Sequence, residues 1–271
     1  MTITLHWIPQ RLKMGISGYT ANCLRYGRWA QICDHEGLTL FRWACQAGGS
    51  AAELRYPRYW VTKMQPNEIG RSYDTIAHVW QESHIQSNGI PQLERAIKFT
   101  ESRNYALDIG CGSSGRFLDL LIKHGFQVEG IDVSEKMIAL AKQRHPNISF
   151  YHADICTWNL PRKYDFISAW DSTWHLPLEE QEPVMQKICE GLTQNGVFIF
   201  TTGGLDEPGE KSDSCMGPPM YYSVLGIPKT LELLTRFGCV CRHLEYDQYP
   251  EQHLYMVAQK TQRRRVHANA E

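Results

Sequence analysis

From Met64 onward, apolar and polar positions follow two alternating patterns. Short apolar runs, typical of buried strands, are followed by stretches in which apolar residues recur every three or four positions, as in amphipathic helices. The pattern predicts strands over residues 105–109, 127–131, 148–152, 166–170, 197–202, 239–246 and 253–259. It predicts helices over residues 75–82, 90–99, 116–123, 134–144, 180–192 and 227–237.

Residues with turn and capping preferences mark several of these boundaries. Ser134 can cap the helix that Pro146 ends, and Gly125 suits the position just after a helix. Asn195 and Gly196 predict a turn. Residues 203–226 contain no such element, so we expect a long loop after the fifth strand, of the kind that often forms a lid or binds substrate.

Alternating strands and helices predict an α/β fold. Right-handed crossovers would build a Rossmann-like, doubly wound sheet with helices on both faces. The last two predicted strands are joined only through residues 247–252, which is too short for a crossover, so they should pair antiparallel. We therefore expect residues 64–260 to form a single domain, which would be the catalytic one.

The two ends of the chain differ from this domain. Residues 1–63 hold four of the eight tryptophans and eight Lys or Arg against three Asp or Glu, without a clean period. We interpret them as a poorly ordered extension, or as the product of an upstream start codon; a basic, aromatic partner-binding region is the alternative. Residues 261–271 include three consecutive arginines and predict a solvated basic tail.

Composition narrows the class of protein. The chain has 28 Lys or Arg, 29 Asp or Glu and a formal net charge of −1, so no overall basic field favours nucleic acid. No run of eighteen apolar residues predicts a membrane span, and residues 1–10 lack the pattern of a signal peptide. The nine cysteines are scattered, and Cys239 and Cys241 have no second pair with which to bind zinc. We expect free thiols in a cytoplasmic protein.

A glycine-rich segment carries the first sign of chemistry. Gly110, Gly112 and Gly115 lie between the first strand and the next helix. Glycines let the backbone turn sharply and approach a ligand closely, and the helix N-terminus offers free N–H groups. This spacing also occurs in dinucleotide-binding proteins, so alone it does not identify the ligand.

Acidic residues at strand ends sharpen the prediction. Asp132 follows the second strand, 20 residues after Gly112, where a carboxylate can accept hydrogen bonds from both ribose hydroxyls of NAD or of S-adenosylmethionine. Asp108 would repel a pyrophosphate, whereas S-adenosylmethionine has none. Asp154 and Ile155 end the third strand, where an acid can accept from an adenine amino group and an aliphatic chain can cover the ring.

This ordered set of motifs resembles the class I S-adenosylmethionine-dependent methyltransferases of the small-molecule type, over roughly residues 70–260. The resemblance implies a seven-stranded sheet of order 3-2-1-4-5-7-6 whose last strand is antiparallel. It implies that S-adenosylmethionine is the cofactor and that the following residues hold or orient it: Tyr73 in a lid helix, Asp108, Gly110, Cys111, Gly112, Asp132, Val133, Asp154, Ile155 and Ala169.

The residues that would bind the methyl acceptor are less clearly indicated by the sequence. Trp170 and Trp174, after the fourth strand, could form the wall of an apolar pocket. His175 could take a proton from the acceptor, with Asp171 orienting it, or could make a structural hydrogen bond instead. Tyr221 and Tyr222 could contact the acceptor or pack beneath the predicted loop.

These observations predict in-line methyl transfer to a small molecule. Such a reaction depends on alignment and requires neither a metal nor a covalent nucleophile. A nucleic-acid acceptor is disfavoured because no Asn-Pro-Pro-Tyr-type motif follows the fourth strand. A non-catalytic S-adenosylmethionine-binding protein and an NAD-dependent oxidoreductase remain as alternatives, and the sequence does not indicate an oligomeric state.

Overall fold

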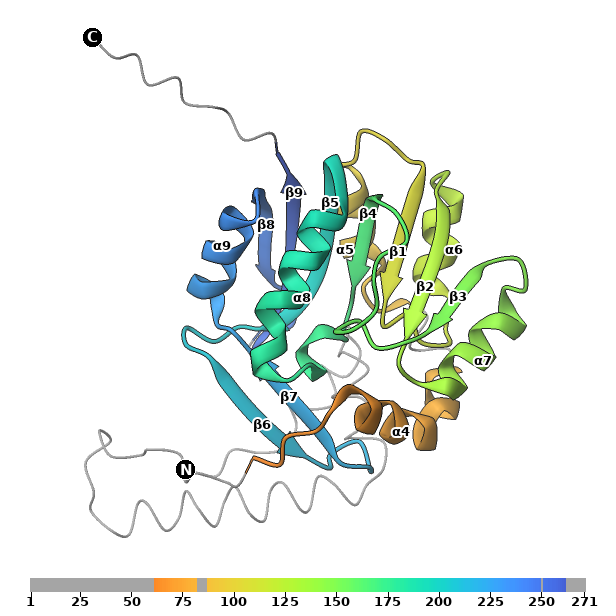
Figure 1. Ribbon diagram of the computed structural model, residues 1–271, viewed down its shortest axis with the longest axis vertical. Helices are drawn as coiled ribbons and strands as arrows, with labels where there is room; N and C mark the ends of the chain where they lie inside the picture. Colours follow the sequence, from red (N-terminus) through yellow and green to blue (C-terminus); the bar gives the residue numbers. More distant parts are fainter. Residues whose placement is uncertain (1–60, 82–86, 250, 262–271) are drawn as a thin grey trace, which may run out of the picture.

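The computed structural model describes residues 61–81, 87–249 and 251–261. Three predicted features lie wholly or partly outside these residues: the N-terminal extension up to residue 60, residue 82 of the first predicted helix, and the tail beyond residue 261. Seven strands form one sheet in the order β3-β2-β1-β4-β5-β9-β8 (Figure 1). They are β1 (Tyr105–Ile109), β2 (Gln127–Asp132), β3 (Ser149–His152), β4 (Tyr164–Ala169), β5 (Leu192–Gly203), β8 (Cys239–Tyr246) and β9 (His253–Lys260).

The sheet confirms the predicted topology. Strands β1 to β5 pair in parallel, whereas β9 is antiparallel to both β5 and β8. The expected order 3-2-1-4-5-7-6 is therefore observed, because β8 and β9 are the sixth and seventh strands of this sheet. Parallel strands place their carboxyl ends along one edge, where open α/β sheets bind ligands.

Alternate residues of the strands support two separate cores. On β5, Phe198 and Phe200 pack with helices α8 (Leu178–Gly191) and α9 (Ile227–Arg236). Val197 and Ile199 point to the opposite face, where α5 (Ile90–Ile97), α6 (Arg116–Lys123) and α7 (Glu135–Arg144) complete the second core. In Figure 1, α8 crosses in front of the sheet and α5 lies behind it. A central strand buried on both faces is apolar at successive positions, which is why the sequence marks it so clearly.

The predicted capping signals are confirmed. The Ser134 hydroxyl accepts a hydrogen bond from the Met137 amide at 3.1 Å, and this bond caps α7. Gly125, with φ of 92°, follows α6, and the Phe126 amide donates back to the Leu121 carbonyl at 3.1 Å. These local rules hold because each needs only neighbouring residues.

The first predicted helix is wrong in position. Helix α4 covers Pro66–Ile76, and a 3₁₀ helix, η3 (Ala77–Gln81), replaces the helix expected over 75–82. Pro66 occupies the first turn, and Gln65 and Glu68 form a reciprocal capping box in which the Gln65 amide donates to the Glu68 carboxylate at 2.7 Å. The start signal is thus present in the sequence, at Gln65 rather than at Thr75.

The loop predicted over residues 203–226 contains a β-hairpin. Strands β6 (Gly209–Asp213) and β7 (Met220–Val224) pair antiparallel and form a separate two-stranded sheet below the main one in Figure 1. Two element boundaries before this hairpin also differ from the prediction. Strand β4 ends at Ala169, so Trp170 is not part of the sheet, and helix α8 begins at Leu178 rather than at residue 180. Among the described helices, none is long and apolar enough to cross a membrane.

Candidate functional site

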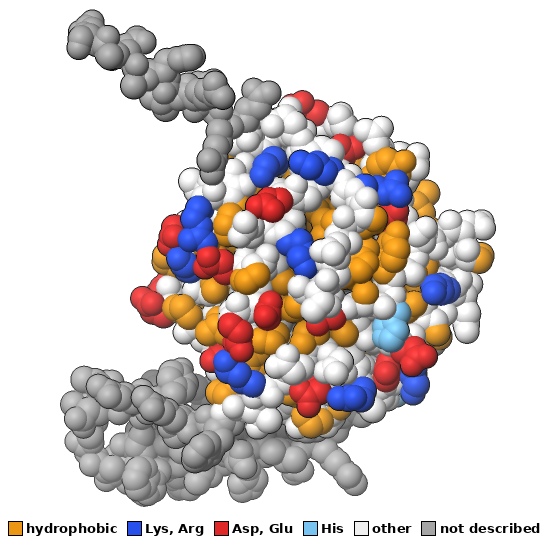
Figure 2. Space-filling model, in the orientation of Figure 1, with side chains coloured by type: hydrophobic (Ala, Val, Ile, Leu, Met, Phe, Trp, Pro, Cys, Tyr) orange, Lys and Arg blue, Asp and Glu red, His pale blue; other side chains and the backbone are white. Residues whose placement is uncertain are grey.

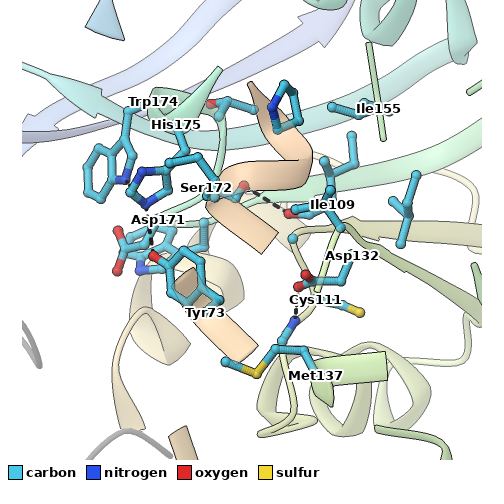
Figure 3. Close-up of a pocket in the computed structure, with 18 of the residues that line it drawn as sticks. Tyr73, Ile109, Cys111, Asp132, Met137, Ile155, Asp171, Ser172, Trp174 and His175 are labelled. Atoms are coloured by element: carbon cyan, nitrogen blue, oxygen red, sulfur yellow. Dashed lines mark hydrogen bonds between the residues drawn. The ribbon is translucent and has the colours of Figure 1, made fainter. Parts of the chain in front are cut away.

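A deep cleft lies at the carboxyl ends of β1, β2 and β4. It holds about 1410 Å³ of space, counted out to the open solvent at its mouth. Helix α4 and the tip of the β6–β7 hairpin cover it, through Tyr73 and Met216 respectively. Figure 3 shows its two sides, with Asp132, Cys111 and Ile155 on one and Tyr73, Trp174 and His175 on the other.

The two central glycines of the loop differ in the space around them. Gly110 has φ of 69°, and a Cβ atom there would lie 2.3 Å from the Ser172 Cβ. The Ser172 hydroxyl donates to the Ile109 carbonyl at 2.9 Å, so this close approach is fixed. At Gly112, with φ of 57°, a Cβ would meet only Trp80, at 3.7 Å, because this position faces the cleft.

Asp132 joins the loop to the neighbouring helix. Its two carboxylate oxygens accept from the Gly112 amide at 2.9 Å and from the Ser134 amide at 2.8 Å. Burial raises the pKa of this carboxyl, and the two backbone hydrogen bonds oppose that rise. Each carboxylate oxygen can accept more than one hydrogen bond, so the group can also receive two hydroxyl donors from the cleft.

Three further predicted residues complete this side of the cleft. Val133, Asp154 and Ile155 all line it. Asp154 is held by the Cys156 amide, which donates to its carboxylate at 2.8 Å, and Ile155 is buried. We refer to Asp132, Val133, Asp154 and Ile155 as the nucleoside end, because it offers carboxylates for ribose and adenine donors beside an apolar wall for a flat ring.

Asp108 lies beneath the loop and is not part of the cleft lining. Its carboxylate accepts from the Ser168 hydroxyl at 2.6 Å, across the β1–β4 pairing. Burial raises the pKa of Asp108 to about 6, while the Ser168 bond and Arg116 act in the opposite direction. The predicted role in orienting the loop fits this placement, whereas direct cofactor contact does not.

His175 is a buried hydrogen-bond centre. Its Nδ1 lies 2.8 Å from the Tyr221 carbonyl, which can only accept, so Nδ1 carries the proton. Its Nε2 therefore accepts, from the Tyr73 hydroxyl at 2.8 Å and from the Trp174 indole at 3.2 Å (Figure 3). Burial lowers the pKa of His175 to about 4. The structural alternative describes this residue better than proton abstraction, because its lone pair is occupied and its basicity is low.

The predicted lid position of Tyr73 is supported by helix packing. Gly70, one turn earlier on α4, lies so close to the β2–α7 connection that a Cβ there would be 2.6 Å from the Val133 carbonyl oxygen. This close approach brings Tyr73 over the cleft, where its ring meets His175 and Trp80 edge-on at centroid distances of 5.4 and 5.5 Å. Asp74 accepts from the Ser134 hydroxyl at 2.6 Å and fixes α4 to the start of α7.

Asp171 does not orient His175 as expected. Its carboxylate accepts instead from His253 Nε2 at 3.0 Å and from the Asn88 side chain at 3.2 Å. His253 Nδ1 lies 2.5 Å from Asp247, so both ring nitrogens donate to carboxylates. Burial opposes the charge on this imidazole, but Asp171 and Asp247 together raise the pKa of His253 to about 10. We call Asp171, His253 and Asp247 the charged triad.

Two more predicted contacts lie outside the cleft lining, and a third lines it but is almost fully buried. Ala169 is fully buried in the core between the sheet and α8. Tyr221 is also fully buried, and its hydroxyl accepts from the Leu178 amide at 3.2 Å and donates to Glu210 at 2.5 Å. Its packing role is therefore the correct one, because alternation along β7 turns Tyr222 toward the cleft and Tyr221 away. Trp170 lines the cleft but is 4% exposed.

Several residues of the cleft were not predicted. Ser172 fixes the loop, and Trp80, Asn88 and Arg116 line the cleft. Arg116 immediately follows the glycine segment, and its Nε donates to the Asn88 carbonyl at 2.8 Å. Its position, at the start of the helix that follows the glycine loop, was a sequence signal that could have identified Arg116 as a site residue. Asn88 and Trp80 carry no such local signal, since their position depends on how the chain before β1 folds back.

The arrangement as a whole fits S-adenosylmethionine. The open cradle at Gly112, the carboxylate of Asp132 and the apolar wall at Ile155 match a loop-bound amino acid, a ribose and an adenine. Among the described residues, no group of three or more His, Cys, Asp or Glu is placed to bind a metal ion. Fold and site together have the arrangement typical of class I S-adenosylmethionine-dependent methyltransferases.

Comparison with known proteins agrees with this class. Residues 106–196 match the family model described as "Methyltransferase domain". A solved structure of Burkholderia thailandensis 1,6-didemethyltoxoflavin-N1-methyltransferase, with 1,6-didemethyltoxoflavin and S-adenosylhomocysteine bound, superimposes with a TM-score of 0.58 at 15% identity, covering 75% of this chain and 93% of that one. Residues 106–196 thus resemble a methyltransferase domain, and the chain shares its fold with S-adenosylmethionine-dependent methyltransferases of known structure.

Curated relatives cover less of the molecule. Phosphoethanolamine N-methyltransferase of Plasmodium falciparum is 28% identical over 129 residues, 45% of this chain and 48% of that protein. Malonyl-[acyl-carrier protein] O-methyltransferase 1 of Ilyobacter polytropus is 26% identical over 160 residues, 56% of each chain. The chain spans about half the length of these relatives, so their names do not assign its acceptor.

Proposed function

We propose that this protein transfers a methyl group from S-adenosylmethionine to a small-molecule acceptor. The observation that carries the proposal is the continuity of one cleft, which joins the nucleoside end to a second region lined by aromatic side chains. We call this second region the aromatic end; it comprises Tyr73, Trp80, Trp174 and Tyr222. A cofactor bound at the first end would present its methyl group to an acceptor at the second.

The sulfonium of the bound cofactor supplies an electrophilic methyl group. The residues of the chain contribute binding, alignment and exclusion of water. Asp132 and the glycine loop fix the cofactor, while the rings of the aromatic end enclose the acceptor. Positioning of this kind can lower a barrier by roughly 7–11 kcal/mol.

A small-molecule acceptor also agrees with the surface. On the face shown in Figure 2, Lys and Arg side chains are interspersed with Asp and Glu over the described residues, without a broad basic region. Strong nucleic-acid binding depends on clustered basic side chains. A cytoplasmic enzyme acting on a small molecule is the form of the proposal that the sequence favours.

Calorimetric titration tests the proposal. We expect the folded chain to bind S-adenosylmethionine and S-adenosylhomocysteine but not NAD. Asp132→Ala should weaken S-adenosylhomocysteine binding about 30-fold or more, because it removes charge-assisted hydrogen bonds to the ribose. NAD binding in place of S-adenosylhomocysteine, or binding of neither, would contradict the proposal.

Asp74→Ala provides a matched control for this titration. Asp74 also accepts hydrogen bonds at the start of α7, from the Ser134 hydroxyl and the Lys136 amide, but it does not line the cleft. Its replacement should change S-adenosylhomocysteine affinity less than about three-fold. An equal loss in both variants would mean that helix capping, rather than ribose recognition, sets the affinity.

A further inference from the structure

The aromatic end combines ring faces with a single carboxylate. Tyr222 lies over His175 at a centroid distance of 4.8 Å, and Tyr73 and Trp174 surround the same imidazole edge-on. Asp171 lines the cleft beside these rings, and Figure 3 shows it behind Tyr73 on their side of the cleft. The faces of aromatic rings are negative, so rings and carboxylate both favour positive charge.

The Asp171 carboxylate is firmly oriented yet still accessible. Its backbone has φ of 51°, and its amide donates to the Thr201 hydroxyl at 2.7 Å. One oxygen accepts from His253 and the other from Asn88, and the side chain remains 32% exposed. Lone pairs not used by these two donors are available to a ligand in the cleft.

The surrounding charges keep this group ionised. Burial opposes ionisation, but His253, Arg116 and Asn88 outweigh it and lower the pKa of Asp171. The charge of His253 is in turn balanced by Asp247 on its far side, at 2.5 Å. Arg116 is the one Lys or Arg among the described lining residues, and its Nε and Nη1 are already bonded to Asn88 and Ser114.

The described lining residues provide no strong base. His175 has its Nε2 occupied by two donors and a pKa of about 4, and Asp171 is a weaker base than an ordinary carboxylate. A hydroxyl acceptor needs deprotonation to become a good nucleophile, and the resulting oxyanion would face a carboxylate. A neutral amine already has a lone pair, and the positive charge that develops on it would be stabilised there.

We propose that the acceptor atom is an amine nitrogen, recognised by Asp171 together with the ring faces of the aromatic end. The inference rests on the proposed methyl transfer and names its substrate class. An amine that binds as its ammonium first loses one proton to water. The nitrogen lone pair then forms the new N–C bond while the S–C bond breaks and its electron pair stays on the sulfur, which becomes a neutral thioether. Positive charge thus passes to nitrogen, whose N–H stays hydrogen-bonded to Asp171 until water takes the proton.

Binding of two isosteric probes tests the inference. The first probe is N,N-dimethylethanolamine, protonated at neutral pH, and the second is 3-methylbutan-1-ol, in which a C–H replaces the N–H⁺. Both are titrated into protein saturated with S-adenosylhomocysteine, which reproduces the product state. We expect the amine to bind at least about ten-fold more tightly than the alcohol. Equal binding, or no amine binding at 50 mM, would overturn the inference.

Two variants of the charged triad separate recognition from folding. Asp171→Asn suits the left-handed backbone and keeps an acceptor for His253, and it should reduce the amine preference to less than about three-fold. Asp247→Asn removes the same charge from the same imidazole, away from the cleft, and should leave the preference intact. A retained preference in Asp171→Asn would also overturn the inference.

The binding of S-adenosylhomocysteine distinguishes the two failures. If the protein does not bind S-adenosylhomocysteine, the proposed function itself is wrong. Protein that binds it, but not the amine in preference to the alcohol, retains the proposed function and rejects only the amine. Thermal melting of each variant confirms that a lost preference is measured on folded protein.

Discussion

Gly110→Ala is expected to abolish detectable S-adenosylhomocysteine binding and to destabilise the fold by about 3 kcal/mol or more. Two costs add at this position. The backbone has φ of 69°, which disfavours any residue with a Cβ, and that Cβ would lie 2.3 Å from the Ser172 Cβ. Because the Ser172 hydroxyl donates to the Ile109 carbonyl, relief of the clash must move the loop that binds the cofactor. Calorimetry and chemical denaturation measure the two effects.

Gly125→Ala is the matched control. Gly125 has φ of 92°, but a Cβ there would meet nothing within 4 Å. It should therefore carry only the backbone cost, about 1 kcal/mol, and leave cofactor affinity unchanged. The double variant Gly110→Ala with Ser172→Gly should recover part of the lost affinity, because it removes the atom that clashes. If it recovers none although Ser172→Gly alone retains binding, backbone strain rather than the contact with Ser172 explains the loss.

His253→Gln is expected to lower the free energy of unfolding by about 3 kcal/mol or more at neutral pH. The substitution leaves the partly exposed Asp171 and the buried Asp247 near each other without the cation that both contact. The Asp247 side chain is 5% exposed and that of His253 is 10% exposed, so water can replace little of the lost interaction. Urea denaturation at pH 7 measures the change.

The same residue predicts a dependence of stability on pH. The pKa of His253 rises from 6.5 to about 10 on folding, so its contribution is complete below about pH 6.5 and is lost as pH rises toward 10. This contribution is at most about 5 kcal/mol.

His175 makes the stability of the fold depend on pH in the acid range. Its pKa falls to about 4 on folding, so stability decreases as pH drops from about 6.5 to 4. We expect maximum stability near neutral pH.

A second histidine controls for the first. His243 lies on the edge strand β8 and contacts Glu245 at 2.8 Å, with 28% of its side chain exposed. His243→Gln should change stability by less than about 1 kcal/mol, as expected for a pair near the surface. His253→Gln should also flatten the alkaline limb of the stability profile. An unchanged limb would mean that other groups cause the loss of stability at high pH.

The sequence alone determined the fold and the nucleoside end. Strands of the main sheet were predicted because burial on both faces makes successive residues apolar, and the order of strands follows from general rules of chain crossover. Gly110, Gly112, Asp132 and Asp154 were predicted because each sits at a strand end, and parallel strands bring their ends together whatever the details of packing.

Tertiary structure alone decided the hydrogen-bond partners beside the aromatic end. The sequence left two roles open for His175. Its ring bonds to the Tyr221 carbonyl and the Tyr73 hydroxyl, 46 and 102 residues away, and these bonds favour the structural role. Asp171 found His253, 82 residues distant, rather than its near neighbour. Hydrogen-bond partners across the chain depend on where whole elements pack, and a periodic pattern records which face of an element is buried but not which side chain meets it there.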